Sequence, residues 1–168
     1  EGKDLDMVLR TSCSHCNGGG GGFSPTSLAV KIHREILKMA HETRSEAILV
    51  RLHPRAAMAL VGPAGELFDR LETEAGKPIL VQARPLFHPE HYEFKGGRLQ
   101  ELKDRLRQVH KGQKARVTLE ESLGGEHALA TVDGNIIEVL NGHERVGQEV
   151  EIRLIDIDKI VKRAEIFR

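Results

Sequence analysis

The sequence predicts an α+β protein in which a small α/β domain is followed by a five-stranded antiparallel β-barrel. Two observations predict this fold class. Two apolar runs of strand length, 47–52 and 79–83, are separated by patterns of helical period. From Lys114 onward, apolar and polar residues alternate instead, which is the period of a β-strand. We therefore expect a linker segment at 1–23, the α/β domain at 24–96, a connector helix at 97–112 and the barrel at 113–168.

The first helix is predicted from about Pro25 to His41. Ser24 offers an N-cap and Pro25 suits the first helical position, where a missing N–H costs nothing. Apolar residues then recur at four-residue spacing, which gives the helix a buried face: Leu28, Ile32 and Ile36. After the strand at 47–52, Pro54 begins a short helix that is expected to run to about Leu60.

The second half of the α/β domain adds one more helix and two strands. Leu67, Leu71 and Ala75 mark one face of a helix that ends at Gly76, and the strand at 79–83 follows. Tyr92 and Phe94 indicate an edge strand. His88 and His91 lie three positions apart in the loop before it, and we interpret them as surface or core-rim histidines rather than metal ligands.

The connector has the clearest helical period in the chain. Its apolar residues are spaced by three, four and three positions: Leu99, Leu102, Leu106 and Val109. The spacing predicts a helix from Arg98 to His110, closed by Gly112.

Five short runs follow and predict the barrel. Alternation begins at Lys114 and recurs at 128–132, Asp133-Gly134 is a strong hairpin signal, and further runs lie at 136–139, 150–154 and 160–166. Small closed barrels of this size commonly hold single-stranded nucleic acid. Phe167 is the only aromatic residue of this segment, so we expect binding to depend on charge.

Charge is balanced overall, with 25 basic and 25 acidic residues, but it is unevenly distributed. From Lys95 to Arg116 there are eight basic and two acidic residues, a local net charge of +6, whereas 120–158 has ten acidic and two basic residues, or −8. Each charge taken alone is more typical of a solvated surface. Taken together, the cations predict phosphate contacts with RNA by Arg98, Lys103, Arg105, Arg107, Lys111, Lys114 and Arg116, and a second patch of Lys159, Lys162 and Arg163.

The two cysteines, Cys13 and Cys16, form a single CxxC pair followed by five glycines. Two thiolates at this spacing can provide half of a tetrahedral zinc site. The other two ligands could come from His15, His33 or His41, from a separate chain, or from the same pair in a second copy. The alternatives are ordinary thiols in a linker, or a redox pair, although a redox CxxC is expected to open a helix rather than precede a glycine run.

The sequence has neither a membrane-spanning pattern nor a signal-like start. No apolar stretch approaches the length of about 18–20 residues that spans a bilayer, and the start lacks a signal-like segment. We expect a reducing, cytoplasmic setting. Because the first residue is Glu1 rather than methionine, we interpret the sequence as a piece of a longer protein.

Several of these residues carry a family likeness. Leu9-Arg10, the Cys13-x-x-Cys16-x-Gly18 motif and the helix start at 24–28 together resemble the carboxy-terminal part of the ribonuclease E/G family. The resemblance implies that two protomers each donate a CxxC pair to one shared zinc. It also implies that the α/β domain corresponds to the family's small domain, which helps to organise the oligomer. The pattern at 132–154 is similar to a TRAM-type, OB-like RNA-binding barrel.

The sequence departs from the family pattern at Ser14-His15, where a proline-containing interior is frequent, and in its loose glycine spacer. The resemblance places magnesium-dependent RNA cleavage in a domain before Glu1, and no matching positions exist here. We find no nucleophile–base constellation, phosphate loop or paired acid and base carboxylates. The chain alone is therefore expected not to be an enzyme, but an RNA-binding and oligomerisation segment. The alternatives are a redox or metal-sensing protein and a structural protein-interaction module.

Overall fold

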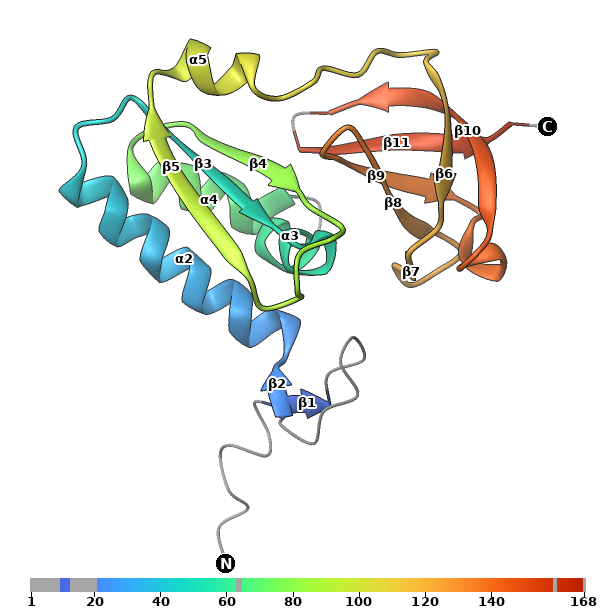
Figure 1. Ribbon diagram of the computed structural model, residues 1–168, viewed down its shortest axis with the longest axis horizontal. Helices are drawn as coiled ribbons and strands as arrows, with labels where there is room; N and C mark the ends of the chain where they lie inside the picture. The colour runs from blue at the N-terminus through green and yellow to red at the C-terminus, as the bar shows by residue number, and fades with distance from the viewer. Residues whose placement is uncertain (1–9, 13–20, 63–64, 159, 168) are drawn as a thin grey trace, which may run out of the picture.

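The computed structural model describes residues 10–12, 21–62, 65–158 and 160–167 (Figure 1). It has the predicted mixed α+β character: an α/β unit lies beside a curled β-sheet, and α5 and the segment after it lead from one to the other. Near the amino end, β1 (Arg10–Ser12) pairs antiparallel with β2 (Gly21–Phe23).

Three helices of the α/β unit begin and end close to the predicted positions. They are α2 (Pro25–Glu42), α3 (Pro54–Val61) and α4 (Glu66–Ala75). The Ser24 hydroxyl accepts a hydrogen bond from the Ser27 N–H at 3.2 Å, which caps α2 as expected. Gly76 ends α4 in the left-handed conformation, with φ of +65°.

The small sheet has the strand order β4-β3-β5 and separates two apolar layers. Its strands are β3 (Ala47–Leu52), β4 (Ile79–Ala83), parallel to β3, and β5 (Tyr92–Gly97), antiparallel to β3. Side chains alternate across β3. Ile48 and Val50 pack in one core with residues of α2, α3 and α4, whereas Ala47 and Leu49 pack in another with Leu102 of α5.

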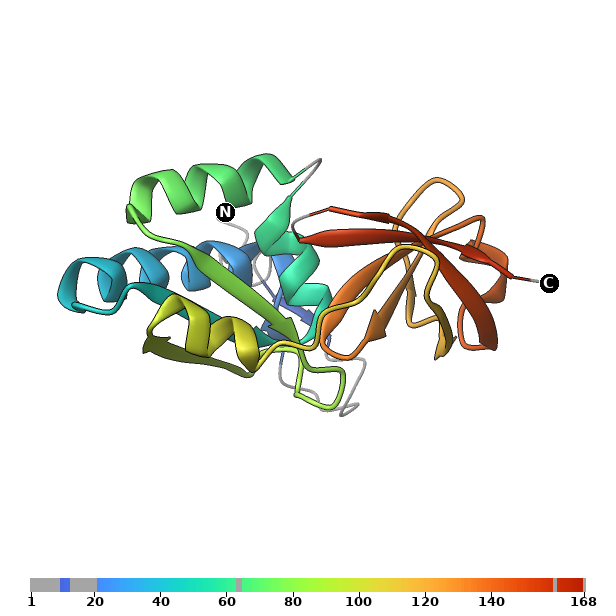
Figure 2. The ribbon, with the colours of Figure 1, turned by 90° about the horizontal axis from the view of Figure 1, so that it is seen from above.

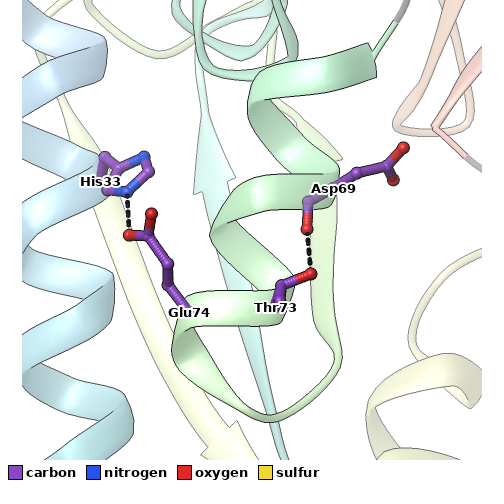
Figure 3. A network of polar contacts seen from close by, with 4 residues as sticks. All are labelled: His33, Asp69, Thr73 and Glu74. Atoms are coloured by element: carbon purple, nitrogen blue, oxygen red, sulfur yellow. Dashed lines mark hydrogen bonds and ion pairs between the residues drawn. The ribbon is translucent and has the colours of Figure 1, made fainter.

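The buried face of α4 differs from the prediction by one position. Phe68 is fully buried with Leu71 and Ala75, whereas Leu67 is 43% exposed. At the other end of the helix, the Nε2 atom of His33 on α2 lies 3.3 Å from the Oε2 atom of Glu74 (Figure 3). The Thr73 hydroxyl donates to the Asp69 carbonyl within α4 at 2.8 Å.

The connector helix is shorter than its apolar period predicts. α5 comprises only Leu99–Asp104, and residues 105–113 are not helical. The reason lies in the packing. Leu102 and Leu106 contact the α/β unit, whereas Val109 joins the core of the curled sheet. The evenly spaced apolar residues thus belong to two different cores, and a single helix does not serve both.

Six strands form the curled sheet, in the order β6-β10-β11-β9-β8-β7. They are β6 (Lys114–Thr118), β7 (Glu121–Ser122), β8 (Ala128–Val132), β9 (Asn135–Leu140), β10 (Glu149–Ile157) and β11 (Val161–Ile166), with a short 3-10 helix, η2 (His143–Arg145), before β10. The expectation of five antiparallel strands is met only in part, because β9 and β11 run parallel and a sixth short strand is present.

The two end strands of this order are neighbours in the chain. Only Leu119 and Glu120 separate β6 from β7. The Leu119 N–H donates to Gln148 O at 3.1 Å on the β10 side, and the Glu120 N–H donates to Leu129 O at 2.8 Å on the β8 side. Residues 114–122 therefore hydrogen-bond toward both ends of the curled sheet.

The α/β unit and the curled sheet share a hydrophobic core. Ala128, Ala130 and Val132 of β8 face the interior of the curled sheet, whereas Leu129 and Ile136 pack with buried residues of the α/β unit. The Ala83 N–H at the end of β4 donates to Gly134 O in the β8–β9 turn at 2.8 Å. An ion pair of 2.9 Å between Arg55 Nε and Glu121 Oε2 adds a polar contact. Figure 2 shows the resulting side-by-side arrangement from above.

Candidate nucleic-acid interface

The connector brings several of the predicted cations to the junction between the two units. Arg98 is the N-cap residue of α5, Lys103 lies in its last turn and Arg105 is its C-cap residue. The side chain of Arg107 is 81% exposed. The Asn135 side chain donates to the Arg107 carbonyl at 2.7 Å, which fixes the connector against the start of β9.

One groove lies between the connector and the loop after β4, and we call it the arginine groove. Its volume is about 410 Å³. It is lined by Gln82, Ala83, Arg84, Pro85, Leu86, Arg105, Arg107, Asp133 and Gly134. Three arginines and one aspartate thus line a single concave surface, and this excess of positive charge favours an anionic ligand.

A second groove of about 370 Å³ lies between the connector and the end of β10, and we call it the lysine groove. Its lining includes Lys103, Arg107, Asn135, Asp158 and Lys162. Arg107 lines both grooves, so the two grooves adjoin at this residue. Members of both predicted basic patches, Lys103 and Lys162, line this groove together.

Lys162 sits in an environment that disfavours its charge. Burial lowers the pKa of its ammonium group below the ordinary value, and the nearby Asp158 carboxylate opposes that shift. The ammonium group also donates to Ile160 O at 3.3 Å. A partly buried cation in a groove is a feature that functional sites share, and an anion bound there would favour the protonated form.

Other predicted cations lie away from the two grooves or are compensated. Arg116 lies between Glu149 and Glu151, whose carboxylate oxygens are 3.7 and 3.0 Å from its guanidinium, and these carboxylates raise its pKa. Arg163 Nε is 3.1 Å from Glu138 Oε2. The ammonium of Lys114 lies 3.8 Å from the centroid of the Phe167 ring.

The remaining three predicted cations add little to this geometry. Arg98 and Lys111 line neither groove, although both are exposed. Lys159 lies outside the described residues. The cations that converge are therefore Lys103, Arg105, Arg107 and Lys162.

The sequence interpretation missed the contribution of the loop after β4. Arg84 lines the arginine groove, and its guanidinium carbon lies 5.6 Å from the centroid of the Phe87 ring. Leu86 is 97% exposed, the most exposed large apolar residue among the described ones. The sequence signal was Arg84-Pro85-Leu86-Phe87 itself, a turn-forming stretch with two large apolar residues in a loop.

The cysteine pair, Cys13 and Cys16, lies outside the described residues, as does His15. The flanking strands β1 and β2 are described, and they pair with Ser12 opposite Gly21. In the part of the chain that the structure describes, no three His, Cys, Asp or Glu side chains gather as a metal site. His88 is half-buried and His91 exposed; His91 Nε2 lies 3.3 Å from Glu93 Oε1.

Comparison with a solved structure gives a weak likeness. The solution structure of a conserved protein from Methanococcus maripaludis matches with 23% identity and a TM-score of 0.33, over 36% of this chain and 83% of that one. None of the helices described here is long and apolar enough to cross a membrane.

Comparison with curated proteins gives a more specific result. Ribonuclease G of Escherichia coli and ribonuclease G of Salmonella typhimurium are each 30% identical over 91 residues, which is 54% of this chain. The match covers 19% of the length of each relative, so the chain corresponds to about a fifth of these enzymes. Residues 12–97, just over half of the chain, match the family described as RNase E/G, thioredoxin-like domain. The chain belongs to the RNase E/G family.

Proposed function

We propose that this chain is an RNA-binding and oligomerisation segment of an RNase E/G-type endoribonuclease that acts in RNA processing or decay in the cytoplasm. Its partners would be single-stranded RNA and a second copy of the chain. The phosphodiester cleavage would belong to a magnesium-dependent catalytic domain outside these residues.

The convergence of Arg84, Arg105 and Arg107 on the arginine groove is the observation that carries the RNA-binding proposal. Guanidinium groups suit phosphate because they are permanently charged and present several donors in one plane. Clustering in a concave surface concentrates their potential, although the formal charge of the whole chain is zero. Family membership adds support, since the curated relatives are ribonucleases by name.

We further infer that the curled sheet is an OB-like, TRAM-like barrel. The support is that residues 114–122 hydrogen-bond toward both β10 and β8, as one bent strand shared by two ends of a sheet would do. Counted in this way the barrel has five strands, with the parallel β9–β11 pair closing part of it. Barrels of this class bind oligonucleotides.

We propose that Cys13 and Cys16 provide half of a Zn–S₄ site that a second copy completes. Two thiolates suit zinc but leave two tetrahedral positions open, and symmetry supplies the same pair again. Pairing of β1 with β2 supports this proposal, because it joins the two ends of the segment that carries the cysteines.

The experiment is a fluorescence titration of single-stranded RNA at several salt concentrations. Wild type is compared with Arg105→Ala and Arg107→Ala, and with Arg145→Ala in η2 as a charge-matched control on an exposed residue. We expect micromolar or weaker binding at physiological salt, with a salt slope that falls by about 0.7 for each lost phosphate contact. The control should keep the wild-type slope.

Two results would contradict the proposal. Binding that is absent at low salt, or that does not respond to salt and to both substitutions, would favour a protein-interaction module. Magnesium-dependent cleavage by the pure chain, lost on mutation of a residue in it, would contradict the assignment of catalysis to another domain.

A further inference from the structure

The outer face of β8 and β9 is not open to a ligand. In OB-like barrels the face formed by the second and third strands commonly binds oligonucleotides. Here, if the curled sheet is such a barrel, those strands are β8 and β9, and their outward residues Leu129 and Ile136 are buried against the α/β unit. Leu123 and Val161, which are partly buried, pack against the same core. A nucleic acid would therefore have to take another path.

The loop after β4 lies beside the arginine groove and offers an apolar surface that a base could contact. The Phe87 N–H donates to Arg84 O at 3.0 Å, which closes a turn with Pro85 at its first central position. The Arg84 N–H donates to Leu52 O at 2.8 Å, which holds the turn against β3. Because the turn is fixed at both points, Leu86 projects from its tip with 97% of its surface exposed.

The wall opposite the loop is cationic. Arg105 and Arg107 come from the connector, and Arg84 stands on the loop side with its guanidinium near the Phe87 ring. An arginine held by an aromatic ring has less freedom to lose when it stacks on a base or binds a phosphate. An exposed apolar side chain and three arginines around one groove together match the chemistry of a nucleotide, which has an apolar base face and an anionic phosphate.

We propose that the arginine groove is a nucleotide subsite for single-stranded RNA, in which Pro85 and Leu86 contact a base and Arg105 and Arg107 hold its phosphate. This inference rests on the proposed RNA-binding function and specifies it: the α/β unit, rather than the curled sheet, supplies the base contact. The groove volume of about 410 Å³ falls in the range of small-ligand sites, which suits one nucleotide rather than a duplex.

The test compares two RNA probes of equal length, an oligouridylate and an abasic oligomer with the same phosphates. We expect Leu86→Ser to weaken oligouridylate binding by about fivefold and to leave the abasic oligomer unchanged. Arg105→Ala should weaken both probes equally, because it removes a phosphate contact. Val30→Ser is the matched control, since Val30 is also exposed, at 48%, and lies on α2.

The outcomes separate the two proposals. If both probes bind and Leu86→Ser weakens neither, or weakens both alike, the nucleotide subsite is wrong while the RNA-binding function stands. If wild type binds neither probe at low salt, the RNA-binding function is wrong and the subsite with it. Thermal unfolding of Leu86→Ser checks that the variant is folded, as expected for a side chain that is almost fully exposed.

Discussion

At the scale of single residues, Asp133 is the one carboxylate that lines the arginine groove, and its Oδ1 atom lies 3.6 Å from Arg107 Nη1. Its negative charge opposes a phosphate and competes for the guanidinium. Asp133 has φ of +49°, a conformation that Asn also tolerates, so Asp133→Asn removes the charge without disturbing the turn.

We predict that Asp133→Asn binds single-stranded RNA up to about fivefold more tightly at low salt, which corresponds to the weak energy of an exposed ion pair. The same fluorescence titration measures it. Glu144→Gln is the control, because the Glu144 side chain is 84% exposed and belongs to η2 rather than to either groove. Equal affinities of wild type and Asp133→Asn would mean that the phosphate lies elsewhere.

Lys162, one of the proposed RNA contacts, destabilises the folded chain when it is charged. Burial lowers its pKa in the folded chain relative to the unfolded chain. Because the folded state binds this proton less readily, the charged lysine lowers the free energy of unfolding at every pH below its folded pKa. This loss of stability disappears as the pH rises from the folded pKa to the higher pKa of the unfolded chain. A bound phosphate would reverse the balance by favouring the protonated ammonium.

At the scale of elements, the β8–β9 turn both shapes the arginine groove and joins the two units. Gly134 has φ of +82°, and a Cβ placed there would lie 2.9 Å from Gln82 Cγ. Gly147 has a similar φ of +86° but nothing within 4 Å of its added Cβ. An alanine at either position would therefore suffer the same backbone strain, but only at position 134 would its Cβ also crowd a neighbouring side chain.

We predict that Gly134→Ala lowers the free energy of unfolding by more than Gly147→Ala does. The shared strain is about 1–2 kcal/mol, and crowding against Gln82 adds about 1 kcal/mol at Gly134. Urea unfolding of both variants measures the difference. Equal losses would show that the turn relaxes away from β4 at no cost, and that its hydrogen bond from Ala83 contributes little.

Local patterns predicted the elements of the α/β unit well, because their signals act within a few residues. Ser24 and Pro25 mark the start of α2, and Gly76 marks the end of α4. The predicted length of the connector helix was wrong because tertiary packing overrides the local pattern. Leu106 and Val109 continue the helical spacing but pack into separate cores. Periodicity records that a side chain is buried, not which core buries it.

Only the part of the candidate site that is contiguous in sequence could be predicted from local patterns. The excess of cations at 95–116 includes Arg105 and Arg107, and both residues line the arginine groove. The sequence could not indicate Arg84, Leu86 and Asp133 as their neighbours, because these come from a loop after β4 and a distant hairpin turn. Whether these groups bind RNA stays a prediction.

At the scale of the whole molecule, the shared core joins the α/β unit and the curled sheet, so each copy in an oligomer would carry its own pair of grooves. Leu129 and Ile136 of the curled sheet are buried in the same core as residues of α2, α3 and α4. A zinc shared at the amino end would then link two such bodies and double the number of groove sites on one assembly. Two linked sites can bind one RNA more tightly than either alone when the strand spans both.

The zinc proposal makes a prediction about stoichiometry. Native mass spectrometry should find one zinc for every two chains, and a chelator should release the metal and separate the chains, because two thiolates from each copy complete a tetrahedral site. Cys16→Ser should prevent both metal binding and dimer formation, whereas His15→Ala should preserve them. Zinc affinity should also fall with pH, since each thiol must lose a proton to bind. One zinc per monomer, unchanged on dilution and lost in His15→Ala, would instead assign the missing ligands to the chain's own histidines.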